Sequence, residues 1–389
     1  MAATSSSAKP NVTLRDIARK VGTSHVTVSL ALRENPRIPP AHRKQIQEVA
    51  RKMGYRPNAT AAALAHFKFH SKQKVVQAAL AWINLWPDAQ KLRECREPAR
   101  YWSGAQAAAE KLGYRLEEFV SNEQMPLARL QEVLLARGIN GILIPPHPVT
   151  PVWDGFHWEH FSVVRIGRSI QIPRTQLVAA DEVANALLAV RSMRERGYAR
   201  IGFVNRPRHG EPSAGNDCFY GEVRMIRESA GFIAAQADLP RSEQLAPLTL
   251  PDEMREREAA LRKWLEKEKP DAVLTNFADT RDLMMAAGFR VPNDLGFASL
   301  RVLSLGADAG VYPNFEEIGR VAILVLVSLV GDHARGLPEI GRQILIEGEW
   351  VDGSSLPELR SHTNLSAPSK SRHAARSHPA RTDFISPAP

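Results

Sequence analysis

The sequence predicts an all-α N-terminal domain followed by an α/β domain of two lobes, on three observations. Apolar residues recur at helical spacing from Val12 to Met53. From Val75 onward, short apolar runs alternate with amphipathic helical segments, which is typical of a doubly wound parallel α/β architecture. The chain has 389 residues, too many for one ordinary core, so two or three domains are expected.

Basic charge gathers at the N-terminal end of the chain. The formal net charge is +9, and residues 1–75 hold 14 Lys or Arg against 3 Asp or Glu. This balance of +11 leaves −2 for residues 76–389, so the whole basic excess lies in the helical segment. A basic helical face is often merely solvated. Here the basic residues lie on a segment that has the pattern of a helix-turn-helix, where cations can neutralise phosphates.

Several classes of protein are disfavoured by what the sequence lacks. No run of about 18 apolar residues occurs, and the first ten residues lack the apolar centre of a signal peptide, so we expect a cytoplasmic protein without membrane contact. Cys95 and Cys218 lie far apart and match no metal spacing, so neither a metal site nor a disulfide framework is expected. No nucleophile elbow, P-loop, dinucleotide-binding fingerprint or metalloprotease motif occurs, which argues against an enzyme and against a cofactor.

The N-terminal segment predicts a helix-turn-helix followed by a third helix. Leu14 to Val21 form one amphipathic helix, Gly22 breaks it, and Ser24 can N-cap a second helix from His25 to Leu32. A proline-rich loop leads to the third helix, which spans residues 41–53 and stops at Gly54. The expected core consists of Leu14, Ile17, Val21, Val28, Leu32, Ile46, Val49 and Tyr55.

Residues 56–66 form a short alanine-rich segment of marginal helical stability. An isolated helix of this length folds poorly in water, so it would form when something docks on it, unless it is a plain linker helix.

The α/β part predicts two series of strands and helices. Strands are expected at 75–83, 114–120, 141–144, 162–166, 177–180, 200–204, 272–275, 296–300 and 343–350. Helices are expected at 101–112, 127–136, 182–196, 219–229, 252–267, 282–287 and 315–330, of which the last is strongly apolar and could pack between lobes. From Ser354 the composition shifts to Ser, Pro, Arg and His, which indicates a disordered tail.

Two stretches of the N-terminal segment resemble the DNA-binding headpiece of the lactose-repressor and galactose-repressor family. They are VTLRDIARKVGTSHVTVSLAL and RPNATAAAL, and the likeness runs without gaps from Val12 to Leu64. More diffusely, residues 76–353 resemble the family's periplasmic-binding-protein-like domain in LLAVRSMRERGYARIGFV, GFRVPNDLGFASL and EEIGRVAILVLVSLV. The resemblance implies a helix-turn-helix headpiece with a hinge helix, followed by a two-lobed α/β domain.

Carried over by position, the resemblance implies that His25, Val26 and Leu30 read base edges in the major groove. An arginine is common in the family where Leu30 stands; leucine has no donor, so contact with a thymine methyl replaces guanine reading. The alternative is that Leu30 turns into the headpiece core. The expected contacts to the DNA backbone, which set register, are Thr13, Ser24, Thr27, Ser29 and Asn35.

Residues 57–65 match the family's hinge helix, which forms on operator DNA and inserts a leucine into the minor groove. Leu64 occupies the position of that leucine, and Asn58 and Ala61 match as well. An apolar wedge costs unstacking energy but yields a bent site that touches more protein.

The effector is expected between the lobes, beyond the carboxyl ends of strands. By that rule, side chains that follow strands are the candidates; they are Trp82, Asn84, Trp86, Arg168, Arg206, Asn276 and Asp279. Aromatic rings and polar groups suit a carbohydrate, although ordinary core and surface packing is the competing interpretation for each residue.

The sequence therefore predicts a transcription regulator, expected to be a repressor, that binds a palindromic operator as a homodimer under the control of a small molecule, with a sugar as the candidate. The alternative is a DNA-binding dimer whose α/β domain no longer binds a ligand. The expected division is a disordered arm (1–11), headpiece (12–56), hinge helix and linker (57–74), two-lobed effector-binding and dimerisation domain (75–353) and disordered tail (354–389).

Overall fold

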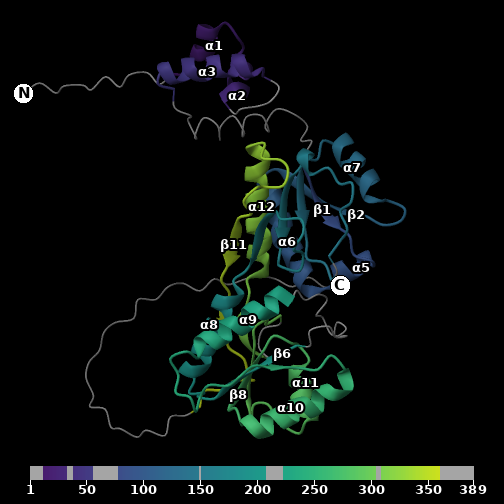
Figure 1. Cartoon of the computed structure of the whole chain (residues 1–389), viewed down its shortest axis with the longest axis vertical. Coiled ribbons are helices and arrows are strands. Elements are labelled where there is room, and N and C mark those ends of the chain that lie inside the picture. Colours follow the sequence, from purple (N-terminus) through teal and green to yellow (C-terminus); the bar gives the residue numbers. More distant parts are fainter. Residues whose placement is uncertain are drawn as a thin grey trace, which may run out of the picture.

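The computed structural model describes residues 12–32, 38–55, 78–148, 150–206, 222–303 and 308–359 (Figure 1). They form a three-helix domain and two α/β lobes, each built on a six-stranded sheet. Among these residues, no helix is long and apolar enough to cross a membrane.

The three N-terminal helices are α1 (Leu14–Val21), α2 (His25–Leu32) and α3 (Pro40–Lys52). Thr13 begins α1 with a capping box, in which its hydroxyl accepts from the Asp16 N–H (3.3 Å) and the Asp16 carboxylate accepts from the Thr13 N–H (3.0 Å). The helices close on Ile17, Val28 and Ile46, whose exposed fraction is 0%. The other expected core residues, Leu14, Val21, Leu32, Val49 and Tyr55, pack half-buried around them.

Lobe one holds a parallel sheet with the order β11-β5-β4-β3-β1-β2. Its strands are β1 (Ala78–Asn84), β2 (Tyr114–Val120), β3 (Gly141–Ile144), β4 (Ser162–Ile166), β5 (Gln176–Ala180) and β11 (Gln343–Ile346). The helices α6 (Arg96–Lys111) and α12 (Phe315–Gly331) cover one face, and α7 (Leu127–Ala136) covers the other. Short helices α5 (Ala89–Glu94) and η1 (Trp158–His160) lie in its loops.

Lobe two holds a sheet with the order β12-β10-β9-β8-β6-β7, in which only β12 runs antiparallel to its neighbour. Its strands are β6 (Ile201–Asn205), β7 (Leu248–Thr249), β8 (Ala272–Thr275), β9 (Gly296–Ser299), β10 (Ala309–Tyr312) and β12 (Glu349–Val351). Helices α8 (Glu182–Glu195) and α9 (Glu222–Ala235) pack together on one face. Helices α10 (Met254–Glu268) and α11 (Thr280–Ala286) cover the other.

The chain crosses between the lobes three times, each time over a short connection. The crossings lie between β5 and α8, between β10 and α12, and between β11 and β12. The last one corrects the expectation of a single strand over 343–350, because the chain turns at Glu347 and Gly348 and divides that run between the two sheets. Gly348 fits this turn because an added Cβ would lie 2.8 Å from the Asn185 Oδ1 atom.

Helix α12 belongs to lobe one and does not pack between the lobes, contrary to the sequence prediction. Its apolar face lies on α6 and the sheet, where Phe315, Ile318 and Ile323 are fully buried. The two helices approach closely because each has a glycine at the contact. A Cβ at Gly319 would overlap the Tyr101 carbonyl oxygen, and one at Gly104 would overlap the carbonyl oxygen of Glu316.

Two further expectations are wrong in part. Residues 354–359 pack on lobe two: the Ser355 hydroxyl donates to the Phe297 carbonyl (2.8 Å), and Leu356 is buried. Composition alone missed this, because hydrogen bonds, such as that from the Tyr198 hydroxyl to the Pro357 carbonyl (2.8 Å), hold the segment together with one buried apolar side chain. Cys95 is disulfide-bonded, although no disulfide was expected. Separation along the sequence does not limit pairing, which depends on the Cα distance in the fold; Cys218 lies outside the described residues.

Candidate DNA-binding and effector sites

The turn between α1 and α2 has the local geometry that a helix-turn-helix requires. Gly22 ends α1 in the left-handed conformation (φ 76°), and its N–H donates to the Ala18 carbonyl at 2.9 Å. The Ser24 hydroxyl then accepts from the Thr27 N–H at 3.0 Å, which confirms Ser24 as the N-cap of α2. Gly22 thus ends α1, and Ser24 begins α2 two residues later.

The residues predicted to read bases differ in exposure along α2. His25, at the first position of the helix, is exposed. Leu30 is half-buried and packs against the headpiece core. The Val26 side chain is not among those the structure describes.

Some of the side chains predicted to contact the DNA backbone make hydrogen bonds within the headpiece. The Thr13 hydroxyl bonds the Asp16 carboxylate at 2.6 Å, and the Ser24 and Thr27 hydroxyls lie 2.8 Å apart. A hydroxyl can still accept or donate a further bond, so these contacts do not exclude a phosphate. The Ser29 side chain, Asn35, and the hinge residues Asn58, Ala61 and Leu64 lie outside the described part of the chain.

Several lysine and arginine side chains of the headpiece are exposed to solvent. The exposed basic residues of α1 and α3 are Arg15, Arg19, Lys20, Lys44, Arg51 and Lys52. Two of them form surface ion pairs within their own helix: Arg19 with Asp16 at 3.7 Å and Lys52 with Glu48 at 2.8 Å. Exposed pairs of this kind are worth little, so these cations remain available for phosphates.

Three of the predicted effector residues are core residues of lobe one. Trp82 is 2% exposed and packs edge-on against Trp102, with 5.3 Å between ring centroids. Asn84 is fully buried and donates to the Glu118 carboxylate at 2.8 Å. The Trp86 indole N–H donates to the Pro146 carbonyl at 2.9 Å. Their polar atoms therefore hold loops of this lobe together.

The predicted residues of lobe two lie together at the ends of β6 and β8. The Asn276 amide donates to Asn205 Oδ1 (3.0 Å) and to Glu228 Oε2 (2.8 Å), and its oxygen accepts from the Arg206 N–H (3.0 Å). Asp279 is the N-cap residue of α11, without a side-chain cap hydrogen bond.

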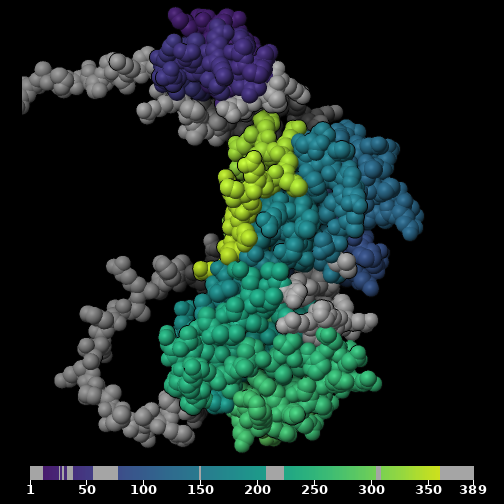
Figure 2. All heavy atoms as spheres, viewed as in Figure 1, coloured from purple at the N-terminus to yellow at the C-terminus, as the bar shows by residue number. Residues whose placement is uncertain are grey.

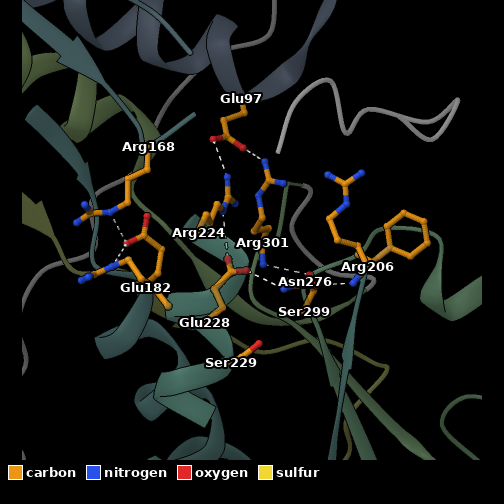
Figure 3. A network of polar contacts seen from close by, with 12 residues as sticks. Glu97, Arg168, Glu182, Arg206, Arg224, Glu228, Ser229, Asn276, Ser299 and Arg301 are labelled. Atoms are coloured by element: carbon orange, nitrogen blue, oxygen red, sulfur yellow. Dashed lines mark hydrogen bonds and ion pairs between the residues drawn. The ribbon is translucent and has the colours of Figure 1, made fainter. Parts of the chain in front are cut away.

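A network of ion pairs joins the two lobes around Glu97 (Figure 3). Glu97 lies in the first turn of α6 and is 3% exposed. Its Oε1 atom accepts from the Tyr101 hydroxyl (2.7 Å) and from Arg224 of lobe two (3.3 Å), and its Oε2 atom pairs with Arg301 of lobe two. Arg224 also donates to Glu228 at 3.1 Å, which links this network to Asn276.

A second part of the network surrounds Glu182, the first residue of α8. Its carboxylate accepts from Arg168 Nε of lobe one (3.0 Å) and from Arg227 Nε of lobe two (3.2 Å). Arg168 also donates to Gln343 of β11 at 2.9 Å. We use the term interlobe network for these side chains together: Glu97, Arg168, Glu182, Arg224, Arg227, Glu228, Asn276 and Arg301.

Burial sets the electrostatics of the interlobe network. Desolvation lowers the pKa of Arg301 to about 9 and raises the pKa of Glu228 above its ordinary value. The Arg224 charge and the Asn276 hydrogen bond oppose the rise at Glu228, while the Glu182 charge adds to it. Loss of hydration is the largest cause of both shifts, so the charged forms of Arg301 and Glu228 are less favourable here than in water.

The cavity enclosed by the lobes is small. It has a volume of about 20 Å³, enough for one water molecule. Its walls include Glu97, Tyr101, Arg168, Glu182 and Arg224. On the face that Figure 2 shows, the atoms of the two lobes are in contact. Among the described residues, the walls of this cavity leave no room for a sugar.

Of the residues predicted from sequence, Arg168 and Asn276 belong to the interlobe network, and Arg206 contacts it through its backbone N–H. Glu97, Arg224, Glu228 and Arg301 were not predicted. Arg301 follows the predicted strand at 296–300, so the strand-end rule applied to that strand would have found it. Glu97, Arg224 and Glu228 lie on helices, where a charged side chain inside a network looks the same in sequence as a solvated one.

Comparison with known proteins agrees with this arrangement. Residues 13–58 match the model of the family described as "Bacterial regulatory proteins, lacI family". The chain is 27% identical over 336 residues to catabolite control protein A of Priestia megaterium, covering 81% of this chain and 92% of that protein. It is 24% identical over 294 residues to the transcriptional regulator GalR of Salmonella typhimurium (73% and 75% covered).

One solved structure reproduces the fold of the two lobes. A transcription regulator-like protein from Staphylococcus haemolyticus superimposes with a TM-score of 0.51 at 14% identity, covering 73% of this chain and all of that one.

Together, the helix-turn-helix domain and the two α/β lobes define a DNA-binding transcription regulator. Residues 13–58 match the lacI family of bacterial regulatory proteins, and the chain as a whole is similar to catabolite control protein A at 27% identity.

Proposed function

We propose that this regulator binds a palindromic operator as a homodimer and acts as a repressor whose DNA affinity changes when a small molecule binds between its lobes. The observation that carries the DNA-binding half is the headpiece, in which Gly22 and Ser24 set two helices at a fixed angle amid exposed cations. Helix α2 would enter the major groove with His25, Val26 and Leu30 toward the bases. Thr13, Ser24, Thr27, Ser29 and Asn35 would contact phosphates.

The hinge is the proposed link between the lobes and the DNA. Residues 57–74 connect headpiece and lobes, and Leu64, with Asn58 and Ala61, would occupy the minor groove at the operator centre. A change in lobe arrangement would make folding of the two hinge helices on DNA easier or harder, which is a two-state coupling. Because the bacterial chromosome is the target, the site of action is the cytoplasm, and no enzymatic step is proposed.

Selection of bound fragments from genomic DNA tests this proposal. The full chain should enrich fragments that share a palindrome with half-sites about one helical turn apart. A His25→Ala variant should lose most of the preference for the palindrome while keeping salt-sensitive binding to unrelated DNA. Enrichment of no common motif would contradict the proposal.

A second candidate function is a DNA-binding dimer whose α/β part takes no ligand. The observation that favours it is the closed interlobe cavity of about 20 Å³, filled by the protein's own ion pairs. Thermal-shift screening with sugars and charged metabolites separates the two candidates. If no compound changes the melting temperature or the operator affinity, the second candidate stands.

A further inference from the structure

Positive charge is in excess where the lobes meet. Within the interlobe network four arginines face three glutamates; the arginines are Arg168, Arg224, Arg227 and Arg301. Arg165, also buried, lies nearby: burial lowers its pKa, and so do the charges of Arg168 and Arg174. The same region therefore holds more guanidinium groups than carboxylates.

Arg168 carries an unused hydrogen-bond donor. Its Nε and Nη1 atoms donate to Glu182 and Gln343, but none of the described residues accepts from its buried Nη2 atom. The side chain is 6% exposed and lines the interlobe cavity together with Arg224. A buried donor without an acceptor is costly, so a group that accepts from Nη2 would be favoured at this point.

We propose that the interlobe cavity takes a small molecule bearing a carboxylate or phosphate group, which binds Arg168 and Arg224 in competition with the Glu97 carboxylate. The proposal rests on the ligand-regulated form of the function proposed above and names the chemical class of that ligand. A guanidinium matches a carboxylate or phosphate with paired hydrogen bonds. Exchange of one anion for another also keeps the buried arginines paired, which a neutral sugar would not do.

The small cavity implies that part of the protein moves when a ligand binds. Because it holds no more than a water molecule, Glu97 must move aside or the lobes must part before an anionic ligand enters. Glu97 is the lobe-one partner of two lobe-two arginines, so its displacement changes the contacts between the lobes directly. Binding of an anion would therefore change the arrangement of the lobes through Glu97.

Calorimetric titration and thermal unfolding of the full chain in phosphate-free buffer test the proposal. Inorganic phosphate is the smallest probe, followed by glucose, gluconate and glucose 6-phosphate. Wild type should respond to phosphate and to the anionic members of the sugar set but not to glucose. Glu97→Gln removes the competing charge, so its affinity for phosphate should rise about tenfold. Arg168→Gln should lose the response, and Arg129→Gln, at an exposed position on α7, should keep it.

Each outcome of these titrations either supports or overturns the proposal of an anionic ligand. Responses to gluconate alone or to glucose 6-phosphate alone both support the proposal and identify the anion as carboxylate or phosphate. An equal response to glucose, an unchanged response in Arg168→Gln, or no response to any anion in wild type and Glu97→Gln would overturn it. The wild-type comparison of glucose with its two anionic forms needs no variant, so it holds even if Glu97→Gln fails to fold. Operator binding by wild type, measured in parallel, shows whether the regulator function stands when the ligand class fails.

Discussion

Glu97 is a single side chain that contacts both lobes. It accepts from Tyr101 and Arg224 and pairs with Arg301, in a region where every partner is largely buried. A buried ion pair adds little net stability, because desolvation offsets the attraction, but removal of one partner leaves uncompensated charge. The network therefore determines how the lobes meet more than how stable each lobe is.

Leu64 is the residue on which the proposed DNA bending depends. Leu64→Ala should weaken operator binding by roughly 2 kcal/mol and reduce DNA bending, because the wedge that holds the central step open is removed. Affinity can be measured by gel shift and bending by circular permutation of the site. The helical circular dichroism of the headpiece should not change. Equal affinity and equal bending in the variant would refute the hinge assignment.

We expect His147 to make the free energy of unfolding depend on pH. Its Nε2 atom accepts from the Leu85 N–H (3.0 Å), its Nδ1 atom lies 2.7 Å from the Pro145 carbonyl, and burial lowers its pKa from 6.5 to about 4. Between these values the unfolded chain binds more protons than the folded one, so the free energy of unfolding falls as the pH falls from 6.5 toward 4.

The contribution of His147 should reach roughly 2–3 kcal/mol at the acid end of this range. Urea unfolding at several pH values measures it. His147→Gln, whose amide can replace both hydrogen bonds, should flatten the dependence, whereas His160→Gln at an exposed position should not. Identical pH profiles of wild type and His147→Gln would contradict this role.

Helices α6 and α12 are the pair of elements on which lobe one is built. Their backbones meet at Gly104 and Gly319, and their apolar faces share one core with the sheet. Because α12 is the segment that returns from lobe two, this contact also fixes the second crossing between the lobes.

The close contact of these helices predicts that Gly319→Ala destabilises the protein by about 2 kcal/mol or more, because the added methyl group must push the backbones apart. Gly331→Ala provides the matched control. It lies at the end of the same helix with nothing within 4 Å of an added Cβ, so it should be neutral or stabilise by up to about 1 kcal/mol. Denaturant unfolding measures both. A similar effect of the two substitutions would show that the approach at Gly319 is not tight.

Sequence patterns predicted helices and strands well where a local run of apolar residues marks them. The apolar runs at 141–144, 162–166 and 272–275 are strands with those bounds. Strand β10 and helix α5 were missed, because each is short and has no clear periodicity. The split of 343–350 between β11 and β12 depends on which sheet has a free edge, a property of the whole fold that no local pattern contains.

Three crossings of the chain and the interlobe network join the two lobes. From sequence, the strand-end rule named Arg168 and Asn276, which belong to this network, and Arg206, whose backbone N–H donates to Asn276. It also named Trp82 and Asn84, which lie within β1, and Trp86, which follows it; all three are buried in lobe one. The acidic partners on helices are specified by tertiary packing alone.

The concentration of basic charge in residues 1–75 predicts strong salt dependence of DNA binding. Each phosphate neutralised lowers the slope of log K against log salt concentration by about 0.9. Lys44→Gln on the exposed side of α3 should weaken operator and unrelated DNA alike and make the slope shallower by about one if this lysine contacts a phosphate. An unchanged slope would place Lys44 away from the DNA.

A hydroxyl-radical footprint of the full chain on an enriched genomic fragment tests the central claim most directly. We expect two protected half-sites about one helical turn apart, related by two-fold symmetry, with a distorted base step between them that is lost in Leu64→Ala. Protection of a single asymmetric site, or uniform protection without any defined site, would contradict a dimeric operator-binding regulator.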